Sequence, residues 1–277
     1  MKFIQITDTH LAPPDTLLWG LDPRARLEAG IADINAHHTD AELCVITGDL
    51  VHKGKLGAYE VLRECLSVLE LPYHLMIGNH DDRETFCRVF PDARCDEHGF
   101  VQNVVHTSAG HFVLTDTHEP RVAWGSYCAR RRAWLKERLD EADEEPVYLF
   151  MHHVPFDIGI PSLDAIGQRD SAEIAELLAP YRNIRFIFFG HVHRPIAGSW
   201  QGFAFSTLRG TNHQVPFDLE TLKPVPKDQE APAYGVVFLD DSLTVVHFHD
   251  YLEDSTLDAH GDPYAPDPAR VSGWRRG

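Results

Sequence analysis

Five short apolar segments of this chain each end in aspartate, asparagine or histidine, and this recurrence limits the folds that the chain can adopt. The clearest case is residues 72–77, which run directly into Gly78-Asn79-His80-Asp81. The other four segments lead into Asp8-Thr9-His10, Gly48-Asp49, His152-His153 and Gly190-His191-Val192-His193. Open α/β sheets build their sites where parallel strands end in this way. We therefore expect the five motifs to meet at the carboxyl edge of one sheet.

The order of the predicted elements supports an α/β fold. Strands are predicted at 2–7, 43–47 and 74–77, and the intervening segments have helical spacing, the first with Asp22 as its cap and Pro23 at its first position. Further strands are predicted at 102–105, 111–115, 147–151 and 184–189, with a helix at 129–141. Beyond residue 200 only strands are expected, at 203–206, 235–239 and 243–249. Because no linker interrupts this order, we predict one domain over 1–251 and a polar tail over 252–277.

Charge and cysteine usage exclude several classes of partner. The chain carries 25 basic and 42 acidic residues, a formal charge of −17, which would repel a long nucleic acid. It has neither an apolar run long enough to span a membrane nor a signal-peptide pattern at its start. The five cysteines show no CxxC spacing. We therefore expect a cytoplasmic protein with reduced thiols that binds neither membranes nor long nucleic acids.

The composition of the five motifs indicates metal binding. The chain has 18 histidines, and residues i and i+2 of an extended segment point the same way, so each D-x-H or H-x-H pair can face one site. Oxygen and imidazole ligands without thiolate suit Fe, Mn, Zn or Co. Asp49 is the natural bridge between two ions, because it has two oxygens and follows a glycine. Two metals about 3.5–4 Å apart can activate a hydroxide and stabilise an in-line displacement at phosphorus.

In order and spacing, these motifs resemble those of the calcineurin-like metallophosphoesterase superfamily. The variants Met151-His152-His153 and Thr211-Asn212-His213-Gln214 are similar to those of the bacterial class III cyclic-nucleotide phosphodiesterases and the related glycerophosphodiesterases. The resemblance covers roughly residues 1–250. It implies a four-layer αββα sandwich, in which two mixed β-sheets are flanked by helices.

The resemblance also implies two transition-metal ions, divalent or of mixed valence, that share one aspartate. The first ion would be held by Asp8, His10, Asp49 and His193. The second would be held by Asp49, Asn79, His152 and His191. His80 would protonate the leaving oxygen, as expected for an imidazole beside the metals that is not needed as a ligand. Asn79, His80 and His213 would contact the substrate, although His213 could equally be a satisfied loop histidine, and His153 would support the ligands.

The expected function is dinuclear metal-dependent hydrolysis of small phosphodiesters, by attack of a hydroxide that bridges the metals. The main prediction is a 3′,5′-cyclic nucleotide such as cAMP. The alternatives are a glycerophosphodiester, a broad-specificity phosphodiesterase or phosphomonoesterase, and a non-enzymatic scaffold on the same fold, which would be expected to have lost ligands.

Three further features bear on the substrate and on assembly. Lys53 stands where the protein phosphatases of the superfamily carry an arginine, so the grip on a dianion is weaker, with Arg83 as one candidate clamp. The loop 11–21, with Trp19, would either form a stacking wall for the substrate alcohol or pack as a lid on its own domain. Self-association through the region beyond residue 200 is implied by family likeness alone.

Overall fold

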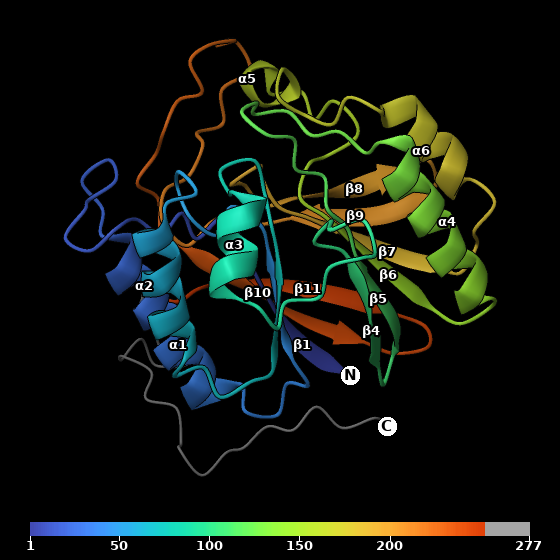
Figure 1. The fold of residues 1–277 in the computed structure, drawn as a ribbon, viewed down its shortest axis with the longest axis horizontal. Coiled ribbons are helices and arrows are strands. Elements are labelled where there is room, and N and C mark those ends of the chain that lie inside the picture. The colour runs from blue at the N-terminus through green and yellow to red at the C-terminus, as the bar shows by residue number, and fades with distance from the viewer. Residues whose placement is uncertain (253–277) are drawn as a thin grey trace, which may run out of the picture.

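The computed structural model describes residues 1–252 and contains two mixed β-sheets packed face to face (Figure 1). The first sheet has, in spatial order, β11 (Thr244–Asp250), β10 (Ala233–Leu239), β1 (Lys2–Ile6), β2 (Cys44–Thr47) and β3 (Tyr73–Met76). The second has β4 (Asn103–Thr107), β5 (Gly110–Leu114), β6 (Val147–Met151), β7 (Ile184–Phe189), β9 (Phe203–Thr207) and β8 (Ile196–Trp200). Parallel strands form the centre of each sheet, while β10, β11, β4 and β8 pair antiparallel at the edges.

Helices cover the outer face of each sheet. The first sheet is covered by α1 (Pro23–His37), α2 (Leu56–Leu66) and α3 (Arg83–Val89), and the second by α4 (Ala129–Ala142) and α6 (Ser171–Leu178), with the short α5 (Pro161–Asp164) above them (Figure 1). Helix α1 begins as predicted, because the Asp22 carboxylate accepts hydrogen bonds from the backbone N–H groups of Arg24 and Ala25 and Pro23 follows it. The arrangement confirms the four-layer αββα sandwich.

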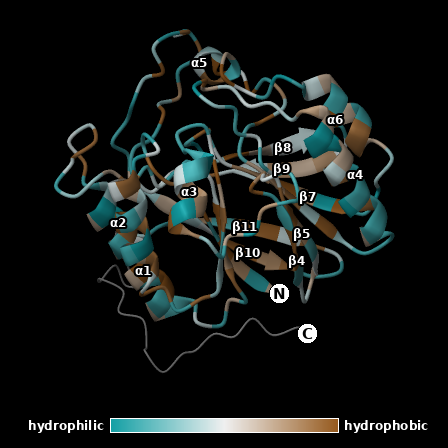
Figure 2. Ribbon diagram, in the orientation of Figure 1, coloured by the Kyte–Doolittle hydropathy of each residue, from teal (hydrophilic) through white to brown (hydrophobic). Residues whose placement is uncertain are grey.

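The core between the sheets is aromatic. Phe3 from the first sheet meets Phe112, Phe150 and Phe188 from the second, with ring centroids 4.9, 5.9 and 5.4 Å away. Both faces of the central strands are covered, which is why these strands read as unbroken apolar runs. Figure 2 shows these brown strands inside and teal residues on the outer sides of the helices. No helix within residues 1–252 combines the length and apolarity needed to cross a membrane.

The expectation that all five motifs lie at the edge of one sheet is wrong. The motifs after β1, β2 and β3 belong to the first sheet, whereas those after β6 and β7 belong to the second. A central strand has the same apolar pattern in either sheet, so periodicity cannot assign it to one of them. The five motifs still meet, because the strands that carry them end at the same end of the sandwich.

Helix α3 and strand β8 were not predicted from the sequence. Helix α3 has only seven residues and begins directly after the Gly-Asn-His-Asp motif, where Asp82 caps it by accepting a hydrogen bond from the Thr85 N–H. Strand β8 is an exposed edge strand that contains Gly198 and Ser199, which have weak strand propensity.

Candidate metal centre

The structure brings together the predicted ligands of the first metal. His10 Nε2 lies 3.1 Å from His193 Nε2 and 3.5 Å from Asp49 Oδ2, and His193 Nε2 lies 3.4 Å from Asp8 Oδ1. One ligand atom from each of these four buried residues lies within 4.8 Å of the others. Ligands bound at about 2.0–2.2 Å around one cation are separated by about 3–3.5 Å. The four side chains therefore have the spacing and the donor chemistry of a transition-metal site.

The second predicted group lies on the other side of Asp49. His152 Nε2 is 3.4 Å from Asp49 Oδ1, and the His152 and His191 rings are 5.3 Å apart. Within residues 1–252, Asn79 Oδ1, His152 Nε2 and His191 Nε2 are buried atoms that find no hydrogen-bond partner. Buried polar atoms of this kind carry a free-energy penalty unless something binds them. A cation that these three atoms and Asp49 share would satisfy them, so the residues fit a second metal.

The backbone at this centre is strained. Five of the seven predicted ligands have positive φ angles, between 44° and 68°: Asp8, His10, Asp49, His191 and His193. Non-glycine residues rarely adopt this conformation, and such strain concentrates at functional sites. Gly48, with φ +97°, cannot be replaced easily either, because a Cβ there would lie 2.5 Å from His152 Nδ1. The chain holds costly conformations here in order to place these side chains.

Backbone carbonyls orient two of the histidines. The carbonyl of Thr47 lies 2.8 Å from His152 Nδ1, and the carbonyl of His213 lies 2.7 Å from His193 Nδ1. A carbonyl can only accept, so each Nδ1 carries a proton, and each Nε2 is the ring atom that faces the other ligand groups. Metal-ligating histidines are commonly fixed in this way.

The electrostatics of the centre favour a bound positive charge. Burial alone would raise the pKa of Asp49, but the surrounding histidines, His152 first, hold that pKa well below its ordinary range. Burial lowers the pKa of His152, yet Asp49 and Asp8 overcome this effect and raise it to about 9. Burial lowers the pKa of His10 well below its usual value, so this imidazole is neutral. The two carboxylates thus remain charged, and divalent cations would satisfy them.

His80 is held beside the centre by two contacts. Its backbone N–H donates to Asp49 Oδ1 at 2.8 Å, and its Nδ1 lies 2.7 Å from the carbonyl oxygen of His52. Its ring is 4.7 Å from that of His10 and stacks on His52 at 5.0 Å. The side chain is partly exposed. Since Nδ1 is committed to a carbonyl, Nε2 is the atom that can exchange a proton with a substrate.

Asp81 connects two of the motif loops. Its carboxylate accepts hydrogen bonds from the backbone N–H groups of Leu50, Val51 and Gly78 and from the hydroxyl of Tyr59. Burial and the nearby Asp49 raise the pKa of Asp81 to about 7, against the effect of these donors. From the sequence, Asp81 was identified only as the last residue of the Gly-Asn-His-Asp motif. In the structure it fixes the loop of Gly48-Asp49 to that of Gly78-Asn79.

We expect Asp81→Ala to lower the free energy of unfolding by about 3–5 kcal/mol, because it leaves three backbone N–H groups without an acceptor and each costs about 1–3 kcal/mol. Asp81→Asn, which keeps one acceptor oxygen, should cost clearly less. Urea unfolding of the two variants against the parent measures the difference. A loss below about 1 kcal/mol for Asp81→Ala would show that Asp81 does not hold the loops together.

Arg83 is not available as a phosphate clamp, which corrects that suggestion. Its guanidinium donates to both carboxylate oxygens of Asp116, at 2.8 and 2.9 Å. Asp116 also accepts from the backbone N–H groups of Val101 and His118. Asp116-Thr117-His118 follows β5 just as Asp8-Thr9-His10 follows β1, a repeat that sequence reasoning missed. Here the aspartate, Asp116, forms an ion pair with Arg83 instead of contributing to the metal centre.

His213 and His153 both lie against the ligands. The His213 ring is buried, 4.5 Å from that of His193 and 4.8 Å from that of His10. This position favours a role in the site over that of an ordinary loop histidine. His153 Nδ1 lies 2.7 Å from the Thr117 hydroxyl, and its ring is 4.6 Å from that of His191. His153 therefore lies directly beside His191, and its supporting role stays a prediction.

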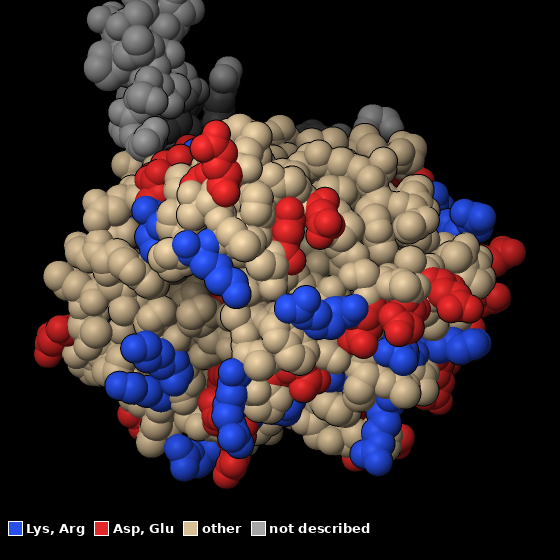
Figure 3. Space-filling view, turned by 90° about the horizontal axis from the view of Figure 1, so that it is seen from above, with Lys and Arg blue, Asp and Glu red and all other residues tan. Residues whose placement is uncertain are grey.

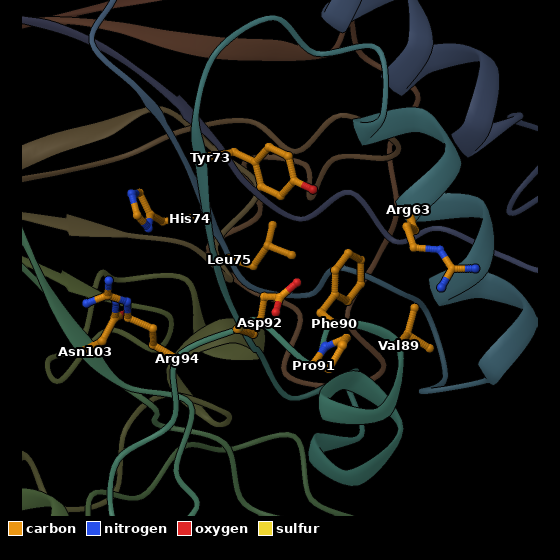
Figure 4. A pocket seen from close by; sticks show the side chains of 11 residues that line it. Arg63, Tyr73, His74, Leu75, Val89, Phe90, Pro91, Asp92, Arg94 and Asn103 are labelled. Atoms are coloured by element: carbon orange, nitrogen blue, oxygen red, sulfur yellow. The ribbon is translucent and has the colours of Figure 1, made fainter.

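A separate cavity of about 360 Å³ lies at the outer edge of β3. Figure 4 shows Tyr73, Leu75 and Phe90 on one side of this strand and His74 and Arg94 on the other. Its lining includes none of the predicted ligands.

Figure 3 views the molecule from above, where Lys and Arg side chains border a tan hollow in the left half of the face. Despite the net charge of −17, this face therefore offers positive groups to an anion.

Comparisons with known proteins agree with this geometry. Residues 1–195 match the family model described as calcineurin-like phosphoesterase. A Rhodopseudomonas palustris protein named "probable cyclic nucleotide phosphodiesterase" is 39% identical over 93% of this chain and 95% of its own length. An Arcobacter nitrofigilis protein named "probable glycerophosphodiester phosphodiesterase" is 28% identical over 79% of this chain and 81% of its own.

A solved structure, a dimetal phosphatase from Danio rerio, has the same fold. It superposes with a TM-score of 0.69 at 13% identity and covers 91% of this chain and 96% of its own. With two sheets that meet at a cluster of buried aspartates and histidines, and with a family model that spans 1–195, the chain belongs to the calcineurin-like phosphoesterase family.

Proposed function

We propose that this protein is a dinuclear metal-dependent phosphodiesterase that hydrolyses small diesters, with 3′,5′-cyclic nucleotides such as cAMP as the leading substrates. The observation that carries the proposal is the position of Asp49. One of its carboxylate oxygens faces His10 and the other faces His152, so a single side chain links two groups of ligand atoms. When bound, two transition metals would supply charge neutralisation at the phosphate and activation of a water molecule.

The residues of the chain have distinct roles in this proposal. Asp8, His10 and His193 would hold one metal and Asn79, His152 and His191 the other, with Asp49 shared. His80 donates a proton from Nε2 to the departing alkoxide, while the carbonyl of His52 fixes its ring through Nδ1. His213 lies against His10 and His193 at the side of the substrate.

Two features favour diesters over monoesters. A phosphomonoester dianion needs more positive charge than a diester, which carries one negative charge. Arg83, the candidate clamp, is bound to Asp116, and Lys53 replaces the arginine of the protein phosphatases. The net charge of −17 further disfavours polyanionic substrates.

Glycerophosphodiesters are the second candidate substrates. They undergo the same displacement, and the Arcobacter nitrofigilis relative is named for such an activity. The relative with the higher identity of the two is named for cyclic nucleotides, which is why these come first.

A panel of substrates tests the proposal. Cyclic nucleotides, linear dinucleotides, glycerophosphodiesters and phosphomonoesters would be assayed with Mn²⁺, Zn²⁺, Fe²⁺ or Co²⁺. We expect kcat/KM for the best diester to exceed that for the best monoester by at least about tenfold. This ratio corresponds to about 1.4 kcal/mol of extra transition-state stabilisation for the diester. A monoester hydrolysed better than every diester would contradict the proposal.

A further inference from the structure

Trp19 is an exposed tryptophan that its loop holds in a fixed place. It is 40% exposed and has a φ of 51°, a conformation that tryptophan rarely adopts. The loop is closed by paired backbone hydrogen bonds between Leu18 and Leu21, and the Gln229 side chain donates to the Trp19 carbonyl at 2.6 Å. Burial does not explain this arrangement, because much of the ring remains in solvent. The loop thus fixes the ring while part of it stays accessible to solvent.

The ring of Trp19 lies over the histidines of the metal centre. Its centroid is 4.1 Å from that of His213, and it meets His52 edge-on at 5.1 Å. His213 in turn lies 4.8 Å from His10, and His52 stacks on His80 at 5.0 Å. The His213 ring thus lies between Trp19 and the predicted ligand His10, and the His52 ring lies between Trp19 and the predicted acid His80. Of the two options for loop 11–21, this favours a wall at the site over a buried lid.

A lysine from a distant part of the sequence lies beside this ring. Lys227 is exposed, and its Nζ is 5.5 Å from the centre of the Trp19 ring. Its loop is anchored by a pair of backbone hydrogen bonds between Gln214 and Asp228. Within residues 1–252 no carboxylate forms an ion pair with Lys227; burial lowers the pKa of its ammonium group, and the charges of Asp49 and Asp8 oppose that shift. The centre therefore has a flat aromatic surface and a free positive charge at its rim.

We propose that Trp19 and Lys227 select the organic group of the diester, accepting a flat neutral group such as a nucleobase and disfavouring a cationic one such as choline or ethanolamine. A nucleobase can stack on the exposed part of an indole ring. The Lys227 ammonium, 5.5 Å from the centre of the ring, repels a second cation. This inference rests on the proposed function, and it explains how one metal centre would distinguish cyclic nucleotides from zwitterionic glycerophosphodiesters.

The test measures kcat/KM for cAMP and for glycerophosphocholine in the full-length protein loaded with metal. Trp19→Ala should raise KM for cAMP by about tenfold with a small change in kcat, and Trp19→Phe should restore most of it. Lys227→Gln should raise kcat/KM for glycerophosphocholine by about fivefold while that for cAMP changes little. The gain should shrink at high salt, because ions screen exposed charges.

Lys223→Gln is the matched control, because it removes the same charge from an exposed position of the same loop. It should leave the ratio of the two kcat/KM values within about twofold of the parent ratio. This change is smaller than the one expected when a charge beside the site is removed. If Trp19→Ala and Lys227→Gln lower kcat/KM equally for both substrates, or change it for neither, the selection proposal is wrong while the diesterase proposal stands. If the parent hydrolyses no phosphodiester with any of the metals, both proposals fail.

Discussion

Replacing Asp49 with asparagine should reduce phosphodiester hydrolysis by at least about a thousandfold. The carboxylate faces both groups of ligand atoms, and it alone would bridge the two metals. An amide has the same shape but lacks the charge and one of the two acceptor oxygens. Metal-ion catalysis contributes several kcal/mol, and each 1.36 kcal/mol of lost transition-state stabilisation gives a tenfold lower rate. The assay is kcat/KM for bis(p-nitrophenyl) phosphate at saturating Mn²⁺.

Asp82→Asn provides the matched control for this variant. This variant makes the same exchange of carboxylate for amide at a nearby residue. Asp82, however, is exposed, and it caps α3 by accepting a hydrogen bond from the Thr85 N–H. Asparagine is an equally good N-cap, so activity and stability should stay near those of the parent. Activity of Asp49→Asn within about tenfold of the parent would exclude Asp49 as the bridge between two metals.

His80→Ala should show an effect that depends on the leaving group. With cAMP, whose leaving group is an alkoxide, the loss in kcat should be about 100- to 1,000-fold, the range of general acid catalysis. With bis(p-nitrophenyl) phosphate the leaving nitrophenolate is a weak base and needs no proton, so the loss should stay below about tenfold. The orientation of His80 on the His52 carbonyl and its contact with Asp49 place its free nitrogen for this transfer.

Comparing the two substrates in one variant separates proton donation from a general disturbance of the site. His106→Ala, at an exposed position of β4, is the control and should leave both rates unchanged. Equal losses for the two substrates in His80→Ala would indicate that His80 binds the phosphate or supports the loop rather than protonating the alcohol.

Much of the fold and of the centre could be predicted because the relevant signals are local. Buried parallel strands give unbroken apolar runs, and Asp, Asn and His directly after them mark the functional end of the sandwich. The positions of Asp8, His10 and Asp49 followed from this pattern. The assignment of strands to two sheets did not, since β2 and β6 have the same kind of sequence and differ only in their neighbours.

The residues that sequence reasoning missed act through distant contacts. Asp81 binds backbone groups some thirty residues earlier, at Leu50 and Val51. Lys227 approaches Trp19 across more than two hundred residues, so no spacing rule connects them. Asp116 did have a local signal, because its tripeptide repeats that of Asp8, but only the structure shows that Arg83 occupies it.

Anomalous X-ray diffraction from crystals grown with Mn²⁺ would show directly whether two metals bind on either side of Asp49. We expect two anomalous peaks per chain, about 3.5–4 Å apart, one beside Asp8, His10 and His193 and the other beside Asn79, His152 and His191, with Asp49 between them. A single peak, or two peaks away from Asp49, would contradict it.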